Sequence, residues 1–223
     1  MTVISIPASL QGNYSVSIGA AWPVTRAKTD PDGFSGNGLY GFYIYTGTSI
    51  ATLWRVFVYF DTSSIPAGAV ISAAKLELYH TQVLNDFSAW SATLLSGMPT
   101  YPHNPFDMAP GADWDLDANY TNGGGQLASV DMTIGAYSSL NLSATGISWI
   151  NKGVGAVTKF MVADLNNDVP NINPGVLGSN AGNRGWFQTE IEANPPLLTV
   201  TYTSGSGSAP VVNNVNLLSM GLL

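Results

Sequence analysis

Residues 54–80 carry the strongest fold signal in the chain: Trp-Arg-Val-Phe-Val-Tyr-Phe-Asp-Thr-Ser-Ser-Ile-Pro-Ala-Gly-Ala-Val-Ile-Ser-Ala-Ala-Lys-Leu-Glu-Leu-Tyr-His. The run at 53–60 is dense in aromatic and β-branched residues, which suit a pleated, half-buried surface. The run at 70–80 alternates apolar and polar side chains, which predicts a strand with one packed face and one wet face. The alternation places Ala74, Leu76 and Leu78 on the packed face, and Lys75, Glu77 and Tyr79 on the wet face. We therefore predict a β-structure with one side packed and one side in water.

The composition is poor in charge. Charged residues make up 9% of the 223-residue chain, against roughly 25% in an average globular protein. The net charge is −7 and only 7 residues are Lys or Arg, which is too few for a clustered phosphate-binding surface. We therefore expect neither nucleic acid nor an anionic membrane surface as a partner.

The N-terminal sequence and the absence of Cys bear on the location of the protein. The first residues, Met-Thr-Val-Ile-Ser-Ile-Pro, lack the basic and long apolar segments of a signal peptide, so we expect no signal peptide in this chain. No window holds the roughly 18 apolar residues of a membrane span. With no Cys, disulfides and thiolate metal sites are excluded. Low charge with many polar loop residues is common in extracellular and virion proteins, and we predict a virion or extracellular surface assembly.

Residues 1–203 are predicted to form one domain. Short strand patterns recur along it, including one at 130–134, but from 96 to 126 the periodicity vanishes in a Pro-rich stretch that ends with a Gly-Gly-Gly run. We expect this stretch to be a long irregular loop, and long loops are often functional. Residues 143–152 are the best helix candidate, with Ser143 as the N-cap and Gly153 after the end.

The composition changes sharply after residue 203. Residues 204–208 read Ser-Gly-Ser-Gly-Ser, which is typical of a flexible linker, and residues 209–223 form an uncharged apolar tail. One interpretation is a disordered terminus. The other is a docking segment that pairs with another copy of the chain or with a neighbouring structural protein, as in β-strand addition. Its predicted assembly residues are Val211, Val212, Val215, Leu217, Leu218, Met220, Leu222 and Leu223.

Two motifs resemble the DNRLRE domain family. The first is Arg-Val-Phe-Val-Tyr-Phe-Asp at 55–61, followed by an Ile-Pro-Ala-Gly turn and the strand Ala-Lys-Leu-Glu-Leu-Tyr at 74–79. The second is the closing Pro-Leu-Leu-Thr-Val-Thr-Tyr at 196–202. The resemblance implies a jelly-roll-like antiparallel β-sandwich. Members of the family occur in secreted polysaccharide-active and cell-surface proteins, similar modules occur in phage structural proteins, and some bind carbohydrate. The Trp-x-Glu…Thr-Trp segment common in the family is replaced here by the Pro-rich stretch.

Tryptophans in or near the Pro-rich stretch are candidates for carbohydrate binding. Exposed indole rings stack on sugar rings because they combine a large apolar face with a polar edge. We predict such a platform from Trp90, Trp114, Tyr101 and Tyr120. The alternative for any tryptophan is core packing, which we expect for Trp54 and Trp149.

Few other residues are candidates for metal binding, ligand binding or catalysis. Asp113, Asp115 and Asp117 alternate in the long loop and are a candidate Ca²⁺ site, although the spacing is not that of an EF-hand. The alternative, which the composition favours, is a solvated loop. Arg55 and Asp61 are read as a loop anchor and a turn cap, with a ligand-contacting pair as the alternative. His80 and His103 lie in no catalytic or metal motif, and no nucleophile or phosphate-loop motif occurs.

Two functions from different classes follow. The first is a non-enzymatic structural module, such as a virion decoration protein, tail component or surface fibre subunit, that docks through residues 209–223. The alternative is a carbohydrate-binding module of a secreted or surface protein. We expect no enzymatic activity and no required cofactor.

Overall fold

The computed structural model describes residues 1–18, 33–35, 40–46, 51–85, 91–96, 121–173, 182–188 and 192–205. Antiparallel strands dominate this part of the chain, so the predicted all-β class is confirmed. A 3-10 turn, η2 (Ser129–Asp131), and an α-helix, α3 (Ala144–Ser148), accompany them. The strands are β1 (Thr2–Ile18), β2 (Gly33–Ser35), β3 (Tyr40–Thr46), β4 (Ala51–Asp61), β5 (Val70–Asn85), β6 (Ser91–Ser96), β7 (Thr121–Ala128), β8 (Tyr137–Asn141), β9 (Val157–Asp164), β10 (Gly182–Phe187) and β11 (Leu197–Thr203).

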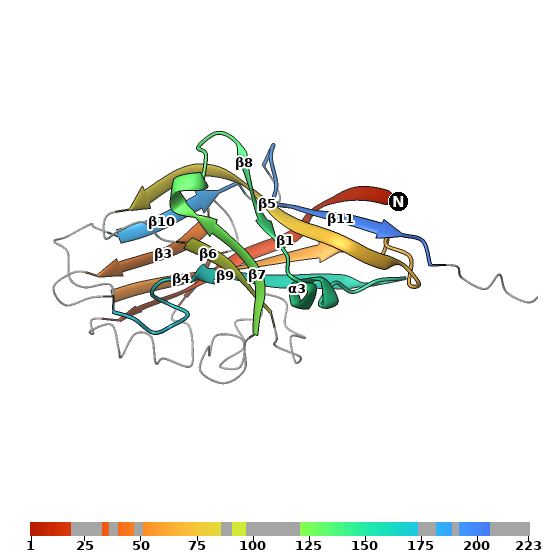
Figure 1. Cartoon of the computed structure of the whole chain (residues 1–223). Coiled ribbons are helices and arrows are strands. Elements are labelled where there is room, and N and C mark those ends of the chain that lie inside the picture. Colours follow the sequence, from red (N-terminus) through yellow and green to blue (C-terminus); the bar gives the residue numbers. More distant parts are fainter. Residues whose placement is uncertain are drawn as a thin grey trace, which may run out of the picture.

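The strands close into a barrel-like ring (Figure 1). The order around the ring is β1–β11–β5–β10–β3–β4, and β4 pairs with β1 again. Strands β9, β6 and β7 continue from β4, and β8 adds to β5. The long strands β1 and β5 each serve two sheets: their first halves pair with β11, and their second halves pair with β4 and β10. The described strands thus form an antiparallel all-β structure with one short α-helix, as predicted.

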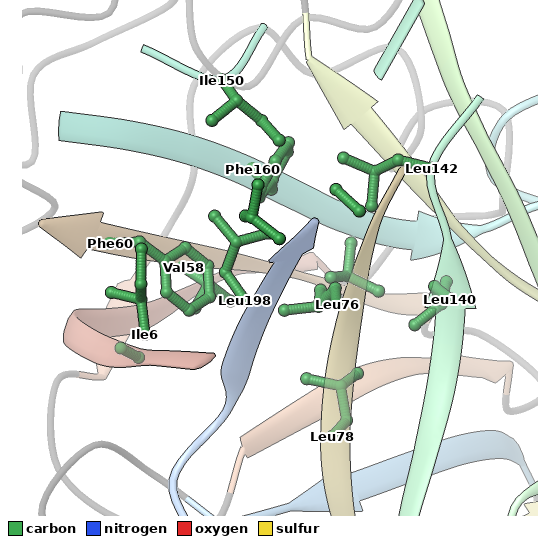
Figure 2. Packing of buried hydrophobic residues seen from close by; sticks show 14 of the residues in the cluster. Ile6, Val58, Phe60, Leu76, Leu78, Leu140, Leu142, Ile150, Phe160 and Leu198 are labelled. Atoms are coloured by element: carbon green, nitrogen blue, oxygen red, sulfur yellow. The ribbon is translucent and has the colours of Figure 1, made fainter. Parts of the chain in front are cut away.

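The core lies between the two sheets. Ile6, Leu76 and Leu198 from the β1–β11–β5 sheet face Val58 and Phe60 from β4 (Figure 2). Leu76 and Leu78 are fully buried, as the alternation of β5 predicted, whereas Lys75, Glu77 and Tyr79 lie partly exposed on the other face. β5 therefore has the one packed face and one wet face expected from the sequence.

Strand β4 differs from that expectation because both of its faces are buried. Val56, Val58 and Phe60 join the core, and the alternate residues Arg55 and Phe57 are at most 1% exposed. β4 has β1 along its length and β3 and then β9 beside it, so it is a central strand. A continuous run of β-branched and aromatic residues is typical of strands buried on both faces, which explains why β4 shows no alternation.

The Gly-Gly-Gly run belongs to a strand and not to the predicted long loop. Strand β7 includes Gly123, Gly124 and Gly125, and the ladder with β6 shifts register across them. Gly124 and Gly125 have positive φ angles of 82° and 79°, which glycine adopts without steric strain, so the run forms a bulge. Of the predicted loop, the portion at 97–120 lies outside the described residues.

The segment after β7 also departs from the sequence prediction. The segment at 130–134, predicted to be a strand, is the end of a 3-10 turn followed by irregular chain and the start of a turn, and the strand follows later as β8. The predicted helix is present but shorter, since α3 ends at Ser148. Its cap is confirmed: the Ser143 hydroxyl accepts a hydrogen bond from the Gly146 amide at 3.3 Å.

Candidate functional site

The sequence-predicted binding residues fall outside the part of the chain that the structure describes. This holds for the carbohydrate candidates Trp90, Tyr101, Trp114 and Tyr120, and for the calcium candidates Asp113, Asp115 and Asp117. It holds equally for the assembly residues of the tail at 209–223. Trp149, in contrast, is described and packs against the core, as expected for a structural tryptophan.

Arg55 is a loop anchor, in agreement with the structural interpretation. Its Nε donates to Asp168 Oδ2 at 2.7 Å and its Nη2 donates to Asp168 Oδ1 at 2.6 Å, and neither side chain is exposed. Asp168 belongs to the turn that follows β9, so the pair fixes this turn to β4. Two parallel charge-assisted hydrogen bonds suit the planar guanidinium and hold the turn in one orientation.

Asp61 caps the turn after β4, also as predicted. Its exposed carboxylate accepts a hydrogen bond from the Ser63 amide at 3.0 Å, and hydrogen bonding to Ser63 lowers the pKa of Asp61. Arg55 and Asp61 therefore serve two different local contacts and do not form one ligand-binding pair.

Asp164, at the end of β9, is a buried carboxyl group. Its Oδ1 atom accepts hydrogen bonds from the amides of Asn166 and Asn167, at 2.8 and 2.6 Å, whereas Oδ2 is buried without a hydrogen-bond partner. Burial raises the pKa of Asp164 to about 7, and the negative charge of Asp168 adds to this effect. The side chain is therefore largely protonated in mildly acidic solution.

The outer face of the β1–β11–β5 sheet carries polar side chains that contact one another across the strands. The strand register places Ser5 beside Thr199 and Thr199 beside Lys75. The hydroxyls of Ser5 and Thr199 lie 2.8 Å apart, and Thr199 Oγ1 donates to Glu77 Oε2 at 2.5 Å. Glu77 also binds Lys75 Nζ at 2.8 Å. Burial raises the pKa of Glu77, but the hydrogen bonds from Lys75 and Thr199 outweigh it, and the net effect lowers the pKa.

One end of this outer face is apolar. Val3 of β1 is 61% exposed and lies opposite Thr201 of β11, and Val70 of β5 is 63% exposed and lies opposite Thr203. The start of β1, the end of β11 and the start of β5 meet at the same end of the molecule (Figure 1). We call Val3 and Val70 with the threonines between them the apolar end of the outer face. The described chain leaves the sheet at this end, because β11 ends at Thr203.

One sequence pattern, the alternation of threonines near the end of the domain, indicates this surface, although the search for catalytic and binding motifs did not consider it. The repeat Leu-Thr-Val-Thr-Tyr-Thr at 198–203 places threonines at alternate positions, which predicts a half-exposed strand. The alternation does not reveal that β1 and β5 flank this strand, because pairing partners depend on the topology of the whole ring.

No family model matches the chain, and no curated protein matches it closely enough to be called a relative. Within the described ranges, no three or more His, Cys, Asp or Glu side chains are grouped so that they could hold a metal ion. None of the described helices has the length and apolar character needed to cross a membrane.

Proposed function

We propose that this protein is a non-enzymatic structural module of a larger assembly, of the virion or surface-fibre type, which docks through residues 209–223. The proposal rests on one observation, which is where the last described strand ends and what sequence follows it. The last strand ends beside two exposed valines, and an uncharged tail with eight large apolar residues follows a short Ser/Gly linker. Apolar side chains such as those of the tail are stabilised when packing against another surface removes them from water.

The contacts of the ionisable residues support the same proposal. Arg55, Asp168 and Asp61 hold turns in place, and Glu77 bridges neighbouring strands. These groups therefore contribute to the architecture of the sheet and its turns. A structural module needs a rigid framework with an attachment segment, and the tail supplies the attachment.

Deleting residues 209–223 tests the proposal. We expect the shortened protein to keep the far-UV circular dichroism and the urea midpoint of the full chain, because its core residues lie before residue 203. We expect its self-association or its attachment to the assembly to be lost, as measured by sedimentation velocity. Normal association of a shortened protein that is folded would refute the proposal.

Carbohydrate binding is a second candidate, supported by the connection between β6 and β7. Ser96 and Thr121 are paired neighbours in the ladder, so residues 97–120 form a long connection between the adjacent ends of two strands. Long connections on a rigid sheet often carry binding residues. Trp114→Ala should weaken retention of the protein in polysaccharide-containing gels, whereas Val154→Ala, at a fully exposed position, should not. Equal retention of both variants and the unmodified chain would argue against this function.

A further inference from the structure

We propose that the outer edge of β1, together with the apolar end of the outer face, is the receptor for the tail of a second copy of this chain. The inference rests on the proposed function, because it names the surface on which residues 209–223 dock. It is argued from the pairing of β1, from the composition of its edge and from the direction in which the chain leaves β11.

The first half of β1 is paired along one edge only. β11 pairs with Thr2 to Pro7, and β4 pairs with β1 only from Ala8 onwards. Among the described residues no other strand pairs with this half. The Ala8 amide donates to the Pro196 carbonyl at 2.8 Å, so Ala8 directs its backbone groups towards the β11 side. Since successive residues of a strand alternate, Val3 and Ser5 direct their backbone N–H and C=O groups to the open edge.

Along residues 2–6, the composition of this edge offers no protection against pairing. Natural edge strands usually carry charged side chains, proline or bulges that prevent another strand from adding. Residues 2–6 read Thr-Val-Ile-Ser-Ile, in which four of the five residues are β-branched and none is charged. Pro7 lies at the end of the pairing segment and leaves the N–H groups of Val3 and Ser5 in place. The edge is therefore suited to strand addition by an uncharged, β-branched segment, and the tail carries such residues at Val211 and Val212.

The exit of the chain favours the tail of a second copy over the chain's own tail. After Thr203, which pairs with Val70 of β5, the chain passes close to the turn before β5. A Cβ atom added at Gly205 would lie only 2.0 Å from the Gly68 carbonyl oxygen, so the backbone there is tight against the β5 side. The open edge of β1 lies on the opposite side of β11. A chain leaving towards β5 turns away from its own β1 edge and leaves that edge for a neighbouring copy.

Two variants at Ser5 of the full chain test whether the backbone N–H group at the open edge is needed for self-association. Ser5→Pro removes the outward N–H group, and Ser5→Ala is its matched control because both lose the hydroxyl contact with Thr199. We expect Ser5→Pro to weaken self-association at least tenfold in sedimentation velocity, and Ser5→Ala to associate like the unmodified chain. If Ser5→Pro shifts the urea midpoint relative to Ser5→Ala, Val3→Pro against Val3→Ala repeats the test at the other outward position.

A second experiment mixes a variant that is defective in the tail with a variant that is defective in the β1 edge. Leu217→Asp/Leu218→Asp has a defective tail and an intact β1 edge. Ser5→Pro has an intact tail and a defective β1 edge. We expect each to be monomeric alone and the mixture to form a heterodimer. Unchanged self-association of folded Ser5→Pro, or a mixture that stays monomeric, would overturn the inference while leaving tail docking itself intact. Unchanged association of the Leu217→Asp/Leu218→Asp variant would instead refute the proposed function.

Discussion

Arg55 and Asp168 lie 113 positions apart in the sequence and meet in a bidentate ion pair from which solvent is excluded. The pair connects the central strand β4 to the turn after β9. Because both charges are desolvated, their attraction mainly offsets the free energy of removing them from water. The pair therefore specifies where the turn sits more than it raises the overall stability.

Removal of one partner should be far more damaging than replacement of both. Asp168→Ala leaves the buried guanidinium without its carboxylate, and we expect the free energy of unfolding to fall by about 3–5 kcal/mol. Arg55→Met/Asp168→Leu removes both charges and should recover most of that loss. Urea denaturation of the two variants measures the difference, with Asp61→Ala as an exposed carboxylate control. A double variant as unstable as Asp168→Ala would contradict this account of the pair.

His80 should make the protein less stable in acid. Its ring is fully buried against Phe187, neither ring nitrogen has a hydrogen-bond partner within the described structure, and burial lowers its pKa to about 4. The unfolded chain, with a pKa near 6.5, binds a proton that the folded chain rejects. The free energy of unfolding should therefore fall as the pH drops from 6.5 towards 4, by up to about 3 kcal/mol from this residue.

His80→Leu checks this assignment. The variant replaces an unpaired polar ring with an apolar side chain, so we expect equal or higher stability at pH 7 and loss of the acid-dependent decrease. Urea midpoints of the variant and the unmodified chain at pH 4.5, 5.5, 6.5 and 7.5 give the comparison. A constant difference between the two proteins across this range would show that His80 does not titrate on unfolding.

Asp164 should have the opposite pH dependence. Its folded pKa, raised to about 7 by burial, lies above the unfolded value of 3.8, so the folded chain holds a proton that the unfolded chain has lost. Stability from this group is present below pH 3.8 and is lost as the pH rises through 7. Asp164→Asn keeps an acceptor for the two turn amides and cannot ionise. We expect it to match the unmodified chain near pH 4 and to exceed it in urea midpoint at pH 8. A midpoint at pH 8 below that of the unmodified chain would contradict a protonated Asp164.

The regular strands could be predicted from the sequence because their signal is local. The alternation at 74–79 is contained in six residues, and the Ser143 cap needs only the residues beside it. The error at Gly123–Gly125 has a different origin. Three glycines in a row favour a loop when taken alone, and their place in a strand depends on Asn141 and Ser143, which approach from another part of the chain. The open edge of β1 is a non-local property of the same kind, since it depends on where β4 stops pairing.

The glycine bulge should tolerate no side chain at Gly124. Two effects act there: the φ angle of 82° is strained for alanine, and an added Cβ would lie 2.4 Å from the Ser143 Cβ and 2.6 Å from its backbone nitrogen. Gly155 has a similar φ of 72° with nothing within 4 Å, so Gly155→Ala isolates the backbone effect, roughly 1–2 kcal/mol. Gly68→Ala has neither effect.

We therefore expect the order of destabilisation to be Gly124→Ala, then Gly155→Ala, then Gly68→Ala, with the first exceeding the second by more than about 1 kcal/mol in urea unfolding. The excess arises because Ser143 also caps α3 and donates its hydroxyl to the Gly123 carbonyl at 2.7 Å, so displacing it disturbs the helix and the bulge together. Equal losses for Gly124→Ala and Gly155→Ala would mean that the segment around Ser143 can move aside at little cost, and that the contact between β7 and the start of α3 is loose.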